Sequence, residues 1–325
     1  MSARNRRSTA AVVTAGAAAL LALCGAAANA MAAPSSGGAA RSSAAMVAAA
    51  SSAHTLTVPR GLTISDGTRH VVVGGRSIDF GTVVRDLAWN PGGSKAAFVD
   101  GHGNLVVSDP DGSHRVTVAV NPGTQTWSHP TWQVTAADRQ NQIPAKNNLV
   151  FSAKIHGKTV LEKVKATGNH GTPAKISLNS EPGEANLPQT DNTWPNVGGS
   201  YGTTVYENTH DGEVYIRDDY LRQQGRALAK GSEPALSPDN EEVVFVRSVH
   251  GHDHLFVEDF GGSAPVVKDV TPHATTDYTE PAWSPNGKTI AFRAPNGTYT
   301  ITKTAHGFGA PVKASSHTGL PAYRG

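Results

Sequence analysis

The stretch PAWSPNGKTIAF at 281–292 decides the fold, because closely related phrases occur twice more in the chain. They are LAWNPGGSKAAF at 87–98 and PALSPDNEEVVF at 234–245. Each copy has a short apolar strand, a turn built from Pro with Gly, Asn or Asp, and a second apolar strand. Such a unit at a fixed pitch is typical of a toroidal or solenoidal β array.

The pitch of the repeat predicts further blades. The turn prolines Pro91, Pro238 and Pro285 are 147 and 47 residues apart, so a period of about 49 residues places two weaker copies between the first two. The weaker copies are HPTW at 129–132 with a second strand at 148–151 after a polar insertion, and TWPN at 193–196 with a second strand at 203–206.

The two ends of the folded region complete one another. Residues 319–323, GLPAY, have the pattern of an inner strand with nothing after it, while 68–73 and 77–83 supply outer strands. Joining them in one composite blade removes the free sheet edges of an open array. The sequence therefore predicts an all-β fold over 54–325, a six-bladed β-propeller of four-stranded blades closed by a composite N-/C-terminal blade.

Four tryptophans lie at the ends of the expected inner strands. They are Trp89, Trp132, Trp194 and Trp283. A large flat side chain at this place can fill the wedge between neighbouring blades. We therefore expect these indoles to serve packing rather than ligand stacking.

The first thirty residues have the organisation of a signal peptide. Three arginines are followed by an apolar run at 10–23 and by Ala-Asn-Ala at 28–30, which correspond to a charged region, a hydrophobic region and a cleavage site. The next segment, 31–53, is almost wholly Ala, Ser and Gly and predicts a disordered linker. We therefore expect an exported protein.

Cys24 is the only cysteine of the 325 residues. It ends the stretch LALC, which resembles a bacterial lipoprotein box except that Leu23 stands where that family usually has Gly or Ala. Lipidation at Cys24 would attach the protein to a membrane, and otherwise we expect a secreted or cell-envelope protein.

Removal of 1–30 leaves 25 basic and 26 acidic residues, a near-neutral balance that argues against nucleic acid as a partner. We expect a monomer.

The repeat resembles that of the TolB-like propellers, a WD40-like family with a consensus close to Glu-Pro-x-Trp-Ser-Pro-Asp-Gly-Lys before an apolar strand. Residues 279–292, TEPAWSPNGKTIAF, match almost throughout, and 232–245 match with Leu236 for Trp and Asn240 for Gly. The resemblance implies an exported bacterial protein whose propeller binds other proteins. TolB itself has an additional α/β domain before its propeller, and we expect none in this chain.

One repeat position is charged or is a histidine in five successive blades. It comes just before the Pro-Ala-Trp step and is expected to ring one mouth of the central channel. Its residues are Asp86, His129, Asp191, Glu233 and Glu280, with Leu320 in the closing blade. Two interpretations stay open: each carboxylate accepts backbone N–H bonds between neighbouring blades, or the ring binds a cation or a basic peptide segment.

Three other motifs contain residues of catalytic or metal-binding types. His250, His252 and His254 alternate in an expected hairpin loop, where they are either candidate ligands of a divalent cation or ordinary solvated side chains. GGSYG at 198–202 fits the G-x-S-x-G pattern, but a β-favouring run follows it, so we interpret it as a turn. DPDG at 109–112 lacks the later ligands of a calcium loop and also predicts a turn.

These motifs name no reaction and no cofactor beyond that candidate cation. We expect a non-enzymatic binding or scaffold protein that recognises a protein or peptide at the channel mouth. The alternative is a secreted metal-dependent glycan lyase or hydrolase, since some propeller lyases acting on uronic-acid sugars use clustered histidines with a metal.

Overall fold

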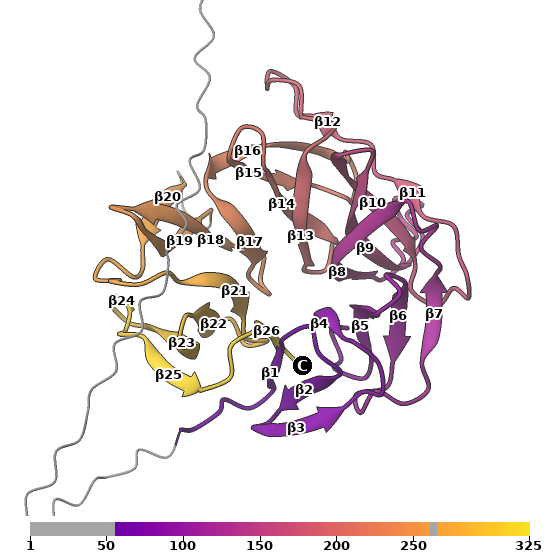
Figure 1. The fold of residues 1–325 in the computed structure, drawn as a ribbon. Coiled ribbons are helices and arrows are strands. Elements are labelled where there is room, and N and C mark those ends of the chain that lie inside the picture. Colours follow the sequence, from indigo (N-terminus) through magenta and orange to yellow (C-terminus); the bar gives the residue numbers. More distant parts are fainter. Residues whose placement is uncertain (1–55, 261–264) are drawn as a thin grey trace, which may run out of the picture. The chain divides into compact units, whose positions relative to one another are not determined.

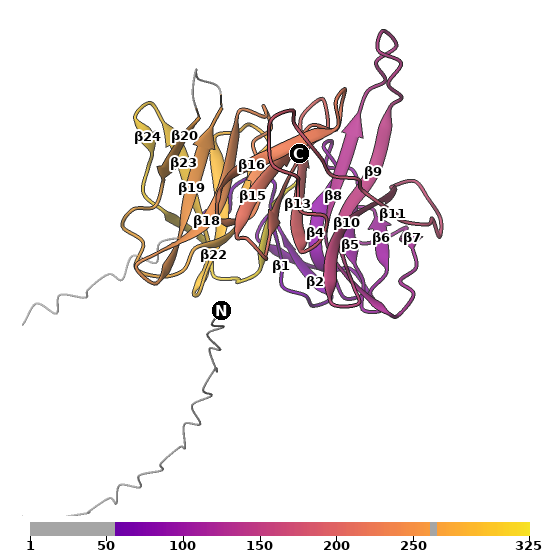
Figure 2. The same ribbon diagram turned by 90° about the horizontal axis from the view of Figure 1, so that it is seen from above.

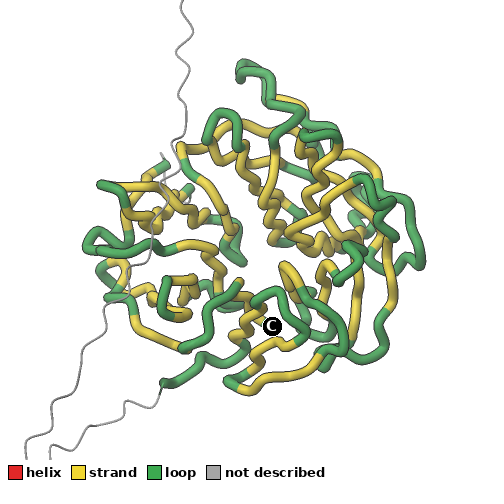
Figure 3. The backbone as a smooth tube through the Cα atoms, in the orientation of Figure 1, coloured by secondary structure: helices red, strands yellow, loops and turns green. Residues whose placement is uncertain are grey.

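The computed structural model describes residues 56–260 and 265–325, which form a six-bladed β-propeller (Figure 1). All regular structure in these ranges is strand (Figure 3). No helix in the described part of the chain is long and apolar enough to cross a membrane. The predicted fold class is confirmed. The signal peptide, the linker and Cys24 lie outside the described residues.

Five blades follow one another along the chain, each with four antiparallel strands ordered outward from the channel. Blade one is β4 (Arg85–Trp89), β5 (Ala96–Val99), β6 (Leu105–Ser108) and β7 (Val116–Ala119). Blade two is β8 (Gln125–Thr135), β9 (Lys146–Ile155), β10 (Lys158–Lys165) and β11 (Ala174–Lys175). Blade three is β13 (Asn192–Gly198), β14 (Thr203–Asn208), β15 (Glu213–Arg217) and β16 (Gln224–Lys230), with β12 (Asn179–Ser180) parallel to β16.

The last two of these blades carry the best copies of the repeat. Blade four is β17 (Ser232–Leu236), β18 (Glu242–Val249), β19 (His252–Asp259) and β20 (Val266–Asp269). Blade five is β21 (Thr279–Trp283), β22 (Thr289–Ala294), β23 (Gly297–Thr304) and β25 (Val312–Ser315), with β24 (Gly307–Phe308) paired to β23.

The sixth blade is composite, as predicted, and it closes the ring. Its strands are β26 (Leu320–Tyr323), β1 (Leu62–Ser65), β2 (His70–Val73) and β3 (Arg76–Asp79). Arg324 fastens this closure, because its backbone N–H donates to Gly61 O at 2.8 Å and its Nε donates to Gly93 O at 2.7 Å. Its guanidinium also lies 5.3 Å from the ring centroid of Trp89 in blade one.

The Pro-containing turns explain why the repeat has its composition. Gly93, Asn240 and Gly287, two residues after each turn proline, have φ of 62°, 63° and 66°. Gly adopts this left-handed conformation without steric cost, and Asn tolerates it better than most residues. Each of the three also donates its N–H to a carbonyl three residues earlier, which closes a tight turn.

The hydrophobic core of the described chain consists of six clusters, one at each interface between neighbouring blades. Three of the predicted wedge tryptophans belong to them. These are Trp89, Trp132 and Trp283, which are 7 or 8% exposed. Trp194 is in none of these clusters; it is half-buried and packs against His129 of blade two, so it lies between two blades without being a core indole like the other three.

Wedge indoles also join neighbouring blades by hydrogen bonds. Trp132 Nε1 donates to Ala88 O in the preceding blade at 3.2 Å, and Trp283 Nε1 donates to Ala235 O at 3.1 Å. The indole therefore supplies both apolar area and a donor at the same place, which is a reason for tryptophan at this position of the repeat.

Blades three and four have no indole at this place and use the backbone instead. Val197 N donates to Thr131 Oγ1 at 3.2 Å, and Leu236 N donates to Asn196 Oδ1 at 2.9 Å. Thr131 and Asn196 replace the alanine of the repeat in the preceding blade. A polar side chain in one blade therefore accompanies the absence of tryptophan in the next blade, and it accepts the backbone N–H there.

The polar insertion of blade two forms the long β8–β9 hairpin, which extends beyond the body of the propeller (Figure 2). Asp219, which follows β15 of blade three and is 2% exposed, accepts hydrogen bonds from Gln133 and Lys146 at the base of this hairpin. It also accepts one from Arg217 of its own blade. Burial alone would raise the pKa of Asp219, but the two cations outweigh burial and lower that pKa. The hairpin is therefore anchored on blade three through a buried ion cluster.

Candidate functional site

Blades one to five share a β-bulge near the start of the inner strand. In each, two inner-strand residues lie opposite one residue of the second strand. The first bulge residue has a φ between 51° and 55° and is Asp86, His129, Trp194, Glu233 or Glu280. Non-glycine residues rarely adopt this conformation, and a bulge re-aims the side chain it contains. All five lie at the strand end opposite the Pro-containing turns, at one mouth of the channel.

The structure corrects the residue predicted for blade three. Trp194, not Asp191, occupies the bulge position, because Pro195 follows it as a proline follows the bulge residue in blades two, four and five. Asp191 precedes β13, and its carboxylate lies 3.0 Å from Lys158 Nζ in an ion pair. The other four predicted residues occupy the expected position; their role in binding stays a prediction.

Carboxylates at the mouth accept backbone N–H groups of the following blade. Asp86 Oδ2 accepts from His129 N at 3.0 Å, and Glu233 Oε2 accepts from Glu280 N at 2.5 Å. In blade three, where Trp194 has no carboxylate, Glu207 on β14 supplies one and accepts from Glu233 N at 2.5 Å. The structural interpretation of the ring is thereby confirmed for Asp86 and Glu233.

Glu207 was not predicted from the sequence. Its signal was weak but readable: it is a single charged residue in the second strand TTVYEN, and it lies opposite Thr193, next to the bulge. The equivalent strands of blades one and five have no carboxylate.

Glu280 has a raised pKa and one carboxylate oxygen without a hydrogen-bond partner in the described chain. Its Oε1 lies 2.9 Å from Arg293 Nη2, whereas its buried Oε2 has no hydrogen-bond partner in the described chain. Burial raises the pKa of Glu280 to about 7; Arg293 lowers it, and the charges of Glu233 and Asp86 raise it. Carboxylates from three blades are therefore close enough to repel one another.

Two further carboxyls at the mouth have pKa values above the ordinary range. Burial raises the pKa of Glu207 to about 7 and also raises the pKa of Glu233, although each accepts a backbone N–H that lowers it. A cation placed among these groups would favour their ionised forms. The mouth is therefore suited to receive positive charge.

An aromatic pair lies beside the carboxylates. The imidazole of His129 and the indole of Trp194 have ring centroids 3.8 Å apart. Burial lowers the pKa of His129, although nearby Asp86 raises it, and His129 Nδ1 is buried without a hydrogen-bond partner in the described residues. A half-buried indole next to buried carboxylates can hold an ammonium or guanidinium group through its ring face.

The three histidines predicted as candidate metal ligands are not brought together. His250 is in the β18–β19 turn, His252 is exposed 3.6 Å from Asp277, and His254 is buried with Nδ1 2.9 Å from Asp269. Among residues 56–260 and 265–325 no group of three metal-ligating side chains is found.

The remaining motifs have the turn geometry expected of them. GGSYG at 198–202 joins β13 to β14, and strand rather than helix follows it, so it is a turn and lacks the strand-turn-helix geometry in which a G-x-S-x-G serine acts as a nucleophile. In DPDG at 109–112, Asp109 binds Lys95 and His114, and Asp111 accepts hydrogen bonds from Ser113.

No family model matches the sequence, and no curated protein matches it. Solved structures with the same fold include a protein from Agrobacterium tumefaciens assigned as a TolB, with a TM-score of 0.53 and 18% identity over 79% of this chain and 89% of that one. TolB from Acinetobacter baumannii matches with a TM-score of 0.58 and 15% identity over 81% of this chain and 66% of that one. The predicted likeness to TolB-like propellers is confirmed at the level of the fold.

Proposed function

We propose that this TolB-like propeller is an exported, non-enzymatic binding protein that receives a basic group of a protein or peptide partner at the channel mouth. The observation that carries the proposal is the Glu280 carboxyl group, buried among other carboxyls with one oxygen left without a partner. An unsatisfied buried polar atom costs free energy, which an incoming N–H donor would recover.

The chemistry of the mouth selects the ligand. Glu280 and Glu233 supply negative charge, and Trp194 supplies an aromatic face in the same ring of bulges. A lysine or arginine side chain, or an amino terminus, combines a charge with donors and satisfies both features. An acidic or purely apolar segment satisfies neither.

Export is part of the proposal and derives from the signal-peptide pattern at 1–30. An exported propeller meets partners of the cell envelope or of the surrounding medium. The near-neutral charge expected after cleavage leaves recognition to local chemistry rather than to long-range attraction.

The proposal is tested with peptides that differ in one side chain. Calorimetric titration of the protein with the N-acetylated peptides Gly-Gly-Lys-Gly-Gly and Gly-Gly-Arg-Gly-Gly, which have no charged amino terminus, should give saturable binding that the N-acetylated norleucine peptide does not give. Glu280→Gln should weaken binding at least tenfold, because a buried charge-assisted hydrogen bond contributes about 1.5–3 kcal/mol. Glu184→Gln, at an exposed loop carboxylate, is the matched control.

Equal binding of the lysine and norleucine peptides, or full binding by Glu280→Gln, would refute the mouth as a basic-group site. A pull-down from cell envelope with the parent, Glu233→Gln and Glu280→Gln proteins then identifies the partner, which both variants should fail to retain.

A further inference from the structure

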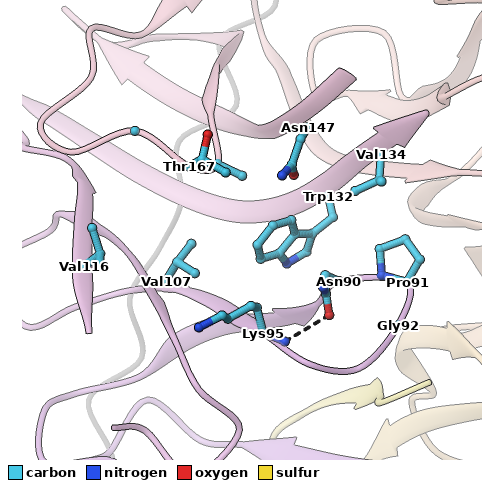
Figure 4. A pocket seen from close by; sticks show the side chains of 12 residues that line it. Asn90, Pro91, Gly92, Lys95, Val107, Val116, Trp132, Val134, Asn147 and Thr167 are labelled. Atoms are coloured by element: carbon cyan, nitrogen blue, oxygen red, sulfur yellow. Dashed lines mark hydrogen bonds between the residues drawn. The ribbon is translucent and has the colours of Figure 1, made fainter. Parts of the chain in front are cut away.

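A second candidate site lies at the opposite end of the inner strands, between blades one and two. It is a pocket of about 340 Å³ next to the Pro91 turn (Figure 4). The indole of Trp132 lies in its centre, with Val107 and Val116 on one side and Val134 on the other. Its volume is within the range of small-ligand pockets.

Within the described residues no cation or aromatic ring lies against the indole of Trp132, unlike the other two wedge indoles, although all three are 7 or 8% exposed. Arg324 lies 5.3 Å from the Trp89 centroid. In blade five, Lys303 lies 5.9 Å and the ring of Phe308 6.2 Å from the Trp283 centroid.

The difference arises after the third strand of the blade. In blade five, β23 is followed by the short strand β24, which carries Phe308. In blade two, β10 is followed by the small residues Ala166, Thr167 and Gly168, all of which line the pocket. The chain itself therefore shows which group fits over such an indole: an aromatic ring.

The charge of the pocket lining indicates the charge of the ligand. Lys95 is the only charged residue that lines this pocket, and its Nζ donates one hydrogen bond, to Asp109 at 2.5 Å. An ammonium has three donors, so two remain for a ligand. The Asn147 amide and the Thr167 hydroxyl, also at the pocket, can add hydrogen bonds.

We infer that this pocket binds a single aromatic ring that bears a carboxylate. The ring stacks on Trp132 between the valines, and the carboxylate accepts from Lys95. Two sources supply this chemistry: a small aromatic acid, or a polypeptide that ends in an aromatic residue. The site is independent of the channel mouth, because it lies at the other end of the inner strands.

The test follows the indole N–H signal of Trp132 by NMR during titration with N-acetyl-phenylalanine. We expect a saturable shift with a dissociation constant of about 1 mM, as for a fragment-sized ligand. N-acetyl-phenylalaninamide, which has no carboxylate, should bind at least threefold more weakly. Lys95→Met should remove that difference while the amide still binds.

Location is tested by filling the pocket. Thr167→Phe places a ring over Trp132, as Phe308 covers Trp283, and should weaken binding at least tenfold. Thr304→Phe adds the same ring in blade five, where the indole is already covered, and should leave binding unchanged. Because Thr167 is exposed, its replacement does not disturb the core.

Two further peptides distinguish the sources. Tighter binding of Gly-Gly-Gly-Phe than of N-acetyl-phenylalanine assigns the site to a polypeptide C-terminus, and weaker binding assigns it to a free aromatic acid. Equal binding of Gly-Gly-Gly-Phe and Gly-Gly-Phe-Gly, or binding unaffected by Thr167→Phe, overturns the proposal.

Discussion

The indole of Trp194 stacks on the imidazole of His129 across the boundary between blades two and three, with ring planes 35° apart. Both residues have positive φ at equivalent bulges. The stack thus joins two blades at the channel mouth, where blade three has no bulge carboxylate. It buries the imidazole beside the carboxylate of Asp86, which bonds the backbone N–H of His129.

Removing the indole should change the titration of His129. Burial lowers the pKa of His129, so Trp194→Ala should raise it toward about 6.5, the value of a solvated imidazole. Trp194→Phe, which keeps an aromatic cover, should shift it less. NMR titration of the imidazole measures this, and an unchanged pKa in Trp194→Ala would exclude the indole as the cause of the burial.

Glu280→Gln should alter how stability depends on pH. The pKa of Glu280 is about 7 in the folded chain and 4.5 by reference, so the folded state holds the proton more tightly. Its contribution to stability is complete below pH 4.5 and is lost as pH rises through 7. Relative to the parent, the variant should gain roughly 3 kcal/mol between pH 4.5 and pH 8.

Urea unfolding at several pH values measures this gain. Glu184→Gln, at an exposed loop carboxylate, is measured in parallel as the control. If Glu280→Gln shows the same difference from the parent at every pH, the carboxyl is not protonated in the folded protein near neutral pH.

Asp219→Asn should release the β8–β9 hairpin. The change leaves Arg217 buried and Lys146 largely buried without their anion, and breaking such a buried pair costs about 3–5 kcal/mol. Limited proteolysis should then cut within 136–145 first. Gln140→Ala, at an exposed side chain of the same hairpin, should cost far less stability; equal losses would show that the buried cluster is not the anchor.

Arg324→Ala should weaken the closure of the ring. It removes a hydrogen bond to Gly93 O and the cation over Trp89, together worth about 1–2 kcal/mol. Chemical unfolding should show this loss, with exposed Arg60→Ala as control. No loss of stability would mean that the strand pairing of β26 with β1 closes the ring without help from this side chain.

The repeat could be predicted well because its signals are local. A turn proline followed by Gly or Asn at positive φ, between two apolar strands, specifies a hairpin within a dozen residues. Even the composite blade was readable, because 319–323 lacked a partner strand. The residues at the channel mouth were harder to predict. The sequence TWPN aligned Trp194 with the wedge tryptophans, because a β-bulge is a backbone feature that these four residues do not indicate.

The sequence by itself determined the six-bladed ring, through turn chemistry and strand pattern repeated at one pitch. Only the tertiary structure decided which groups meet across blades: Glu207 replacing a bulge carboxylate, Asn196 compensating for a missing indole, and the residues of two blades that form a pocket beside Trp132. The physical reason is that these contacts join segments tens of residues apart. They depend on bulges and packing between blades, which local propensity does not specify.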